Sequence, residues 1–341
     1  MDFFTTDTLN VVVQNLLGPG TNWLLDRYFP TIQTSQTEEI HFDVLPGKRR
    51  ISPFVSFLVE GQIVEHPGYT TNTFKPAYVK DKRVFDMNRP FKRSPGEPIG
   101  GNLTPSDRLR ALIAQDMQDQ LWMLNRRFEV MAGEVLTTGK STIVGEKYPS
   151  VVVDFGRAAG NTTVPAVLWS DTTNGVPLTD LENWSLTVLQ STGVALHDVI
   201  MTPDVWTLFR ANKQVQAQLN LYRVLQQMPT LTPGMPLGEG GQFMGTVDAF
   251  NIYVYSAWYI DPADSVEKPI LPAGTVLLCS PAVEGVRAFG AIRDEQAGLQ
   301  AVPYFVKSWT EEDPSVRFIM LQSAPLMVPY RPNASFKAKV T

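Results

Sequence analysis

The sequence has a single cysteine, Cys279, among 341 residues. One cysteine excludes an intrachain disulfide and any metal site built from several thiolates. Cys279 ends the apolar run from 276 to 279, which is typical of a β-strand. We therefore interpret it as a small buried side chain and not as a nucleophile. This cysteine usage fits a reducing compartment, such as a bacterial cytoplasm.

Long apolar runs are also absent. No stretch of about 18 apolar residues occurs, so we expect no membrane span. The first residues, MDFFT, contain no basic segment followed by an apolar block, and no signal peptide is predicted. The net charge is −5 and the isoelectric point is about 5.4, so the chain as a whole does not attract nucleic acid.

The sequence lacks the motifs of common catalytic sites. Its three histidines, His41, His66 and His197, have no partners at zinc-binding spacing, and neither a Gly-x-Ser-x-Gly nor a Gly-x-Gly-x-x-Gly pattern occurs. The segment 133–141 ends in Gly-Lys-Ser, but five residues separate its glycines where a P-loop has four. We interpret it as the end of a helix followed by a turn. The acidic run 311–313 is interpreted as a solvated turn. We expect no enzyme activity, cofactor or metal.

The composition allows a folded core, because 43% of the residues are hydrophobic and only 18% are charged. The clearest element is a helix from Pro105 to Leu136, with Thr104 as its N-cap and Asp107 in its first turn. At about 1.5 Å per residue it would be about 48 Å long. Its apolar residues recur every three or four positions and form one stripe. The stripe consists of Leu109, Leu112, Ile113, Met117, Leu121, Leu124, Phe128, Met131 and Val135.

A ribbon with two mixed faces precedes this helix. The run from Thr70 to Phe85 favours β-structure but has no clean apolar face, so we expect it to project and to lie on a neighbour instead of entering a core. The segment 75–93 carries a local charge of +5, and its aromatic residues alternate with basic ones as in nucleic-acid stacking platforms. Contact with an acidic surface of a neighbouring subunit is an equally good interpretation. The candidate contact residues are Lys75, Tyr78, Lys80, Lys82, Arg83, Arg89, Lys92 and Arg93.

The remaining elements indicate an α+β fold. Residues 1–45 favour either an extended arm, with a short helix near 8–17, or an ordinary strand-bearing N-terminus. A hairpin is predicted over 140–157, helices over 179–191 and 203–220, and a strand over 195–202. A flexible, glycine- and proline-rich loop is predicted over 228–241. Further strands are predicted over 251–260, 275–280, 287–293, 302–309, 316–328 and 335–340.

Four short stretches are distinctive: EGQIV at 60–64, FKPAYVK at 74–80, VDFGR at 153–157 and QSAPLM at 322–327. They resemble the major head protein family of bacteriophage lambda. The resemblance covers about 40 to 328. It implies the tailed-phage, Hong Kong-type capsid fold with an N-arm at 1–45, an E-loop at 46–100, and a peripheral (P) domain at 101–174. The P domain would contain a spine helix at 104–137. An axial (A) domain at 175–290 and C-terminal strands at 291–341 that return to the P domain would complete the fold.

The same resemblance implies a structural role. A major capsid protein of this kind assembles with itself into hexamers and pentamers of an icosahedral head, in the cytoplasm of the host bacterium. The head encloses double-stranded DNA without sequence-specific binding. The expected partners are a separate scaffold protein, a portal and a cement protein, with no membrane. The alternative function is a nucleic-acid-binding phage protein that uses the basic ribbon 75–93.

Overall fold

The computed structural model describes residues 5–16, 22–37, 39–44, 70–85, 89–92, 103–145, 148–224, 235–298, 300–313 and 316–341. The helices are α1 (Thr6–Leu16), α2 (Trp23–Tyr28), α3 (Pro105–Thr138), α4 (Pro177–Thr192), α5 (Pro203–Ala211) and α6 (Lys213–Val224). The first ten strands are β1 (Thr31–Thr34), β2 (Ile40–Val44), β3 (Thr70–Phe74), β4 (Val79–Phe85), β5 (Lys140–Gly145), β6 (Tyr148–Asp154), β7 (Thr162–Thr163), β8 (Asp198–Met201), β9 (Met235–Pro236) and β10 (Gly241–Val247). The others are β11 (Phe250–Tyr255), β12 (Trp258–Ile260), β13 (Glu267–Pro269), β14 (Thr275–Cys279), β15 (Gly285–Phe289), β16 (Phe305–Glu311), β17 (Val316–Ser323), β18 (Pro325–Pro329) and β19 (Ser335–Lys339).

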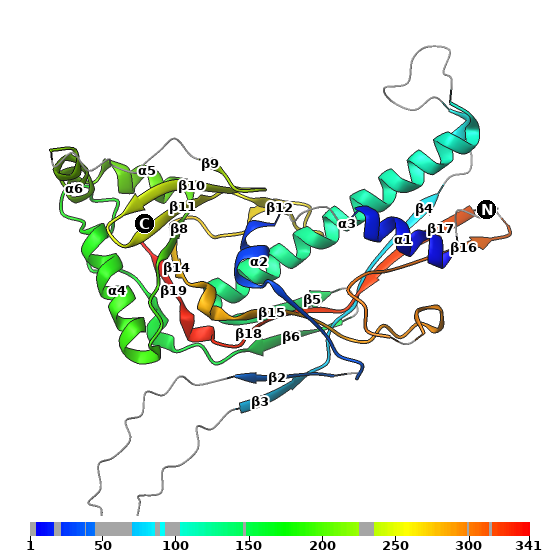
Figure 1. The fold of residues 1–341 in the computed structure, drawn as a ribbon, viewed down its shortest axis with the longest axis horizontal. Helices are drawn as coiled ribbons and strands as arrows, with labels where there is room; N and C mark the ends of the chain where they lie inside the picture. The colour runs from blue at the N-terminus through cyan, green and yellow to red at the C-terminus, as the bar shows by residue number, and fades with distance from the viewer. Residues whose placement is uncertain are drawn as a thin grey trace, which may run out of the picture.

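The long helix α3 runs from the middle of the molecule toward the end opposite α4 (Figure 1). A seven-stranded sheet with the order β7-β19-β14-β8-β11-β10-β9 lies at one end, with α4, α5 and α6 around it. A three-stranded sheet, β16-β17-β4, lies along the other end, and the sheet β1-β15-β18 lies between them. The pairs β12-β13, β2-β3 and β5-β6 complete the described sheets. Parallel and antiparallel pairs are mixed, so the architecture is α+β.

Helix α3 agrees with the helix predicted from the sequence. The hydroxyl of Thr104 accepts a 3.2 Å hydrogen bond from the N–H of Asp107, and Gly139 ends the helix in the left-handed conformation. Gly139 is followed by a strand, so the Gly-Lys-Ser sequence is a helix end and not a phosphate-binding loop. The helix buries Leu112, Ile113, Met117, Leu121, Leu124, Phe128 and Val135, while Leu109 and Met131 are half-buried against the same core.

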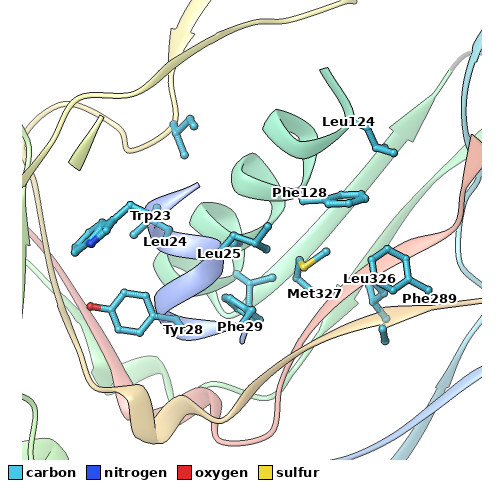
Figure 2. Close-up of a cluster of buried hydrophobic side chains, with 14 of the residues drawn as sticks. Trp23, Leu24, Leu25, Tyr28, Phe29, Leu124, Phe128, Phe289, Leu326 and Met327 are labelled. Atoms are coloured by element: carbon cyan, nitrogen blue, oxygen red, sulfur yellow. The ribbon is translucent and has the colours of Figure 1, made fainter. Parts of the chain in front are cut away.

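The main core forms where α2 packs on α3. Figure 2 shows Leu24 and Leu25 of α2, with Phe29 directly after it, on the side of side chains from α3 and from the sheet β1-β15-β18. Trp23 and Tyr28 point the other way, where Trp23 contacts Tyr253 of β11 and the Tyr28 hydroxyl donates to Asp198 of β8. Phe128 of α3 meets Phe289 of β15 with ring centroids 5.6 Å apart. The N-terminal region is therefore part of this chain's own core, and the sequence did not predict α2.

A second core lies between the seven-stranded sheet and its helices. Trp184 of α4 stacks on Trp169 at 5.9 Å and on Phe336 of β19 at 5.6 Å. Trp169 and Phe336 are both buried, and Trp169 also meets Phe209 of α5. This aromatic cluster fixes α4 and α5 against the sheet, and leaves the outer face of α4 exposed.

Several predicted elements differ from the observed ones. The single helix over 203–220 is wrong, because Asn212 is extended and its side chain accepts a hydrogen bond from the N–H of Gln214, which lies in the first turn of α6. The strands predicted over 251–260 and 316–328 are each divided in two, as β11 and β12 and as β17 and β18. The loop predicted over 228–241 is partly wrong, because β9 occupies 235–236 and β10 begins at Gly241; residues 228–234 lie outside the described residues.

The prediction of one projecting ribbon over 70–85 is also wrong. Strand β3 pairs with β2, whereas β4 pairs with β17 along α3, so the two halves of the run belong to different sheets. Phe85 is buried in the main core. The mixed faces of β4 are explained by this position, because one face meets α3 and the other is exposed.

Candidate assembly surfaces

The predicted contact residues are distributed over β4 and its flanks. Lys75, Lys80 and Lys82 are exposed, as are Arg89 and Lys92, while Tyr78 and Arg83 are half-buried. Arg93 lies outside the described residues. The structure thus distributes the basic residues along α3, from Lys80 near Met131 to Arg89 beside Asp116.

The face of β4 toward α3 holds a network of charges. The guanidinium of Arg83 lies 2.6 Å from the carboxylate of Asp119 on α3 and 3.7 Å from that of Asp81. Burial raises the pKa of Asp81, although the positive charge of Arg83 opposes this shift. Arg89 lies 3.2 Å from Asp116, one turn earlier on α3. Two of the predicted contact residues, Arg83 and Arg89, therefore bind α3 of their own chain and are less available to nucleic acid.

The opposite face of β4 is open and partly apolar. The cross-strand register puts Lys82 opposite Met320, and Val84 opposite Phe318, which in turn lies opposite Trp309. The rings of Phe318 and Trp309 stack at 5.4 Å, and the ammonium of Lys82 lies 3.8 Å from the centre of the Phe318 ring. Val84 is 58% exposed. Aromatic, aliphatic and cationic groups in this arrangement can bind an apolar surface that carries carboxylates.

Tyr78 fixes the segment that leads into β4. Its hydroxyl donates a 2.8 Å hydrogen bond to the carbonyl oxygen of Ala291, and the ammonium of Lys80 lies 5.4 Å from the centre of its ring. The exposed lysines therefore extend from a segment that is anchored to its own chain.

A second surface, not predicted from the sequence, runs along the middle of α3. A groove of about 420 Å³ separates α3 from the hairpin of β12 and β13. Met123, Arg127 and Val130 of α3 line one wall, and Tyr259, Ile260 and Pro262 line the other. Met123 is 51% and Ile260 62% exposed. Met123, Arg127 and Val130 recur at helical spacing outside the predicted stripe. This spacing was the only sign of the groove in the sequence.

Metal sites and membrane spans are not formed by the described residues. Across these ranges, no group of three or more His, Cys, Asp or Glu side chains is placed to hold a metal ion. Nor is any described helix both long enough and apolar enough to cross a membrane. Cys279 is buried as predicted, and burial raises the pKa of its thiol far above the ordinary value. The acidic residues 311–313 are exposed, as expected for a solvated turn.

Comparisons with known proteins identify the family. Residues 5–340 match the family model described as phage major capsid protein E. The major capsid protein of Escherichia phage N15 is 31% identical over 321 residues, which cover 92% of each chain. That of Escherichia phage lambda is 31% identical over 300 residues, or 86% of each chain.

Solved structures share the fold. A prophage capsid protein from Escherichia coli CFT073 superposes with a TM-score of 0.75 at 24% identity over 99% of both chains. A phage-related protein from Bordetella bronchiseptica gives a TM-score of 0.57 at 11% identity, over 98% of this chain and 97% of the other. The predicted Hong Kong-type capsid fold and the resemblance to the lambda family are both confirmed. The chain belongs to the phage major capsid protein E family, and its function is that of a structural subunit of a phage capsid.

Proposed function

We propose that this subunit assembles with itself into hexamers and pentamers of an icosahedral head that encloses double-stranded DNA, without catalysis and without sequence-specific DNA contacts. The observation that carries the proposal is the exposure of apolar side chains on two separate faces, one on β4 and one beside α3. Val84, beside the half-buried Phe318, belongs to the first face, and Met123 and Ile260 belong to the second. Contiguous apolar surface of this kind favours association, and repeated association of one subunit produces a closed, symmetric shell.

We propose that the domains of the subunit follow the family pattern. In our proposal, residues 1–45 are the N-arm, 46–100 the E-loop, 101–174 the P domain, 175–290 the A domain, and 291–341 the returning C-terminal strands. The length of α3 supports its role as the spine helix, since 34 residues give a rod of about 51 Å. The exposed contact residues would then be Lys75, Lys80, Lys82 and Lys92, together with Arg89, which also pairs with Asp116 of its own chain. Arg93 is added from the sequence.

The proposal extends to partners and place. We expect a scaffold protein during assembly, a portal at one vertex and a cement protein on the finished shell. Assembly would take place in the cytoplasm of the host bacterium before the virion is released. The buried, reduced Cys279 is compatible with folding in that compartment.

Negative-stain microscopy of the expressed protein tests the function. We expect shells, or rings of five and six subunits, with a co-expressed scaffold if the subunit alone does not assemble. The control is a nucleic-acid binding assay at low and high salt, where a capsid subunit should give no salt-sensitive, micromolar binding. A monomer that persists with and without scaffold would contradict the proposal.

A further inference from the structure

The groove beside α3 contains a half-buried cation, Arg127, which also borders a second groove of about 430 Å³. Arg127 makes no hydrogen bond or salt bridge with any residue that the structure describes. The other charged side chains nearby are already paired with residues other than Arg127. Arg126 binds Glu239 at 3.1 Å, and the pKa of Asp261 is lowered chiefly by its 2.6 Å hydrogen bond with Lys268 and only slightly by Arg127. A guanidinium held among apolar side chains is a strong binding site for an external carboxylate.

The outer face of α4 has the complementary chemistry. Glu182, Leu186 and Leu189 recur at intervals of four and three residues, so they lie on one side of the helix. Leu186 is 48% exposed, although it is a large aliphatic side chain. Glu182 is exposed and makes no hydrogen bond or salt bridge with any described residue. This face therefore presents one available carboxylate beside two leucines.

We propose that α4 of one subunit lies in the α3 groove of a neighbouring subunit, with Glu182 bound to Arg127. The leucines would pack on Met123, Val130 and Ile260, as an amphipathic helix packs in an apolar groove. The proposal rests on the proposed function, and names the partner surface of that shell as a second copy of this chain.

The fold requires this contact to be between molecules. Figure 1 shows α4 at the end of the molecule beyond the seven-stranded sheet, and β12 beside α3, where the groove lies. The two surfaces are different patches of one subunit, so the contact is heterologous: each subunit offers a helix on one side and a groove on the other. Such contacts close into rings when the rotation between subunits allows it.

A charge swap tests the pairing. Arg127→Glu and Glu182→Arg each place like charges in the contact, and each should lower the assembled fraction at least about tenfold in sedimentation and negative-stain assays. The double variant, with both substitutions in one chain, should assemble like the wild type. Arg127→Lys, which keeps the charge, is the matched control and should assemble within about threefold of wild type.

Mixing the two single variants gives a second, independent result. In a ring of alternating variants, the groove changed by Arg127→Glu receives the helix changed by Glu182→Arg, and the unchanged groove receives the unchanged helix. Every contact then joins opposite charges, so two variants that fail alone should form rings of six when mixed in equal amounts. Glu182→Arg changes only an exposed side chain, so its loss of assembly should come with an unchanged circular dichroism spectrum.

The outcomes separate this inference from the proposed function. If the wild type forms shells and both single variants also form them, the α4–groove contact is wrong and the capsid function stands. If both fail and neither the double variant nor the mixture is restored, the two residues do not face each other and the inference is again wrong. If the wild type itself never assembles, with or without scaffold, the proposed function fails first.

Discussion

The hydroxyl of Tyr255 donates a 2.7 Å hydrogen bond to the carboxylate of Glu129, a buried side chain on α3. The same carboxylate accepts hydrogen bonds of 2.9 and 2.8 Å from the N–H groups of Leu24 and Leu25 in α2. One side chain thereby connects α3, α2 and strand β11 of the seven-stranded sheet. Burial raises the pKa of Glu129, although the three hydrogen bonds favour its ionised form.

We predict that Glu129→Ala destabilises the unassembled subunit by about 3–5 kcal/mol, because three buried donors lose their acceptor. Glu129→Gln keeps one acceptor oxygen and should cost about 1–3 kcal/mol. Tyr255→Phe removes one donor with its hydrogen bond and should cost about 1 kcal/mol. Urea unfolding measures the three free energies. Equal losses for Glu129→Ala and Tyr255→Phe would contradict a role for the carboxylate in holding α2.

The end of α3 gives a matched pair of glycine substitutions. Gly139 and Gly156 both have left-handed backbones, with φ of 69° and 73°. A Cβ at position 139 would lie 2.4 Å from the Cβ of Arg157, whereas a Cβ at 156 would have no heavy atom within 4 Å. Both alanine variants carry about 1–2 kcal/mol of backbone strain, but only Gly139→Ala adds a collision.

The expected result is a loss of about 3 kcal/mol or more in the free energy of unfolding for Gly139→Ala, and about half of that for Gly156→Ala. The measurement is chemical denaturation of both variants under one set of conditions. If the two losses agree within about 0.5 kcal/mol, the close approach of Arg157 to the helix end has no energetic consequence.

The sequence predicts α3 well because its signals are local. The N-cap Thr104, the apolar stripe and the final Gly139 all lie within the element itself or next to it. Helix α2 is different: six residues are too few for a periodic pattern, and its burial depends on contacts with Glu129 and Tyr255, more than 100 residues away. The sequence could not predict it for that reason.

The same reasoning applies to the assembly surfaces. The positive charges of β4 are visible in the sequence, but the pairing of Arg83 with Asp119 depends on how β4 lies along α3. The groove beside Arg127 needs the hairpin of β12 and β13, which is distant in the chain. Residue type therefore predicts which side chains can bind a partner subunit. Tertiary structure determines which of them are already paired within their own chain.

The two faces of β4 should respond differently to charge reversal. Lys80→Glu with Lys82→Glu changes the exposed face, so we expect an intact subunit fold, a loss of about 1 kcal/mol from the contact with Phe318, and defective assembly. Arg83→Glu puts a negative charge beside Asp81 and Asp119, and should lower subunit stability by about 1 kcal/mol or more.

Thermal unfolding and electron microscopy of each variant separate the two effects. Arg83→Glu combined with Asp119→Arg should regain stability, because the pair is restored with opposite polarity. Normal shells from the Lys80 and Lys82 double variant would refute a role for these lysines in subunit contacts. Unchanged stability of Arg83→Glu would mean that its pairing with α3 contributes nothing.

Asp294 makes part of the stability dependent on pH. Burial alone would raise its pKa, but the ammonium of Lys307 and the N–H of Gln296 outweigh this effect, so the pKa of Asp294 is below its ordinary value. Gln322 of β17 adds a 3.3 Å hydrogen bond. Because the pKa is lower in the folded than in the unfolded chain, the stabilisation is fully present above about pH 4 and is lost as the pH falls through the folded value.

Asp294→Asn should therefore lower the free energy of unfolding by about 1–2 kcal/mol near neutral pH, since it removes the charge that Lys307 and Gln296 bind. The difference from wild type should shrink steadily below about pH 4, where the native carboxyl also becomes neutral. Urea titrations of both proteins at a series of pH values measure this difference. Asp313→Asn, at an exposed position, is the control and should follow the wild type throughout. A difference for Asp294→Asn that stays constant down to about pH 2 would mean that the side chain acts through its shape and not through its charge.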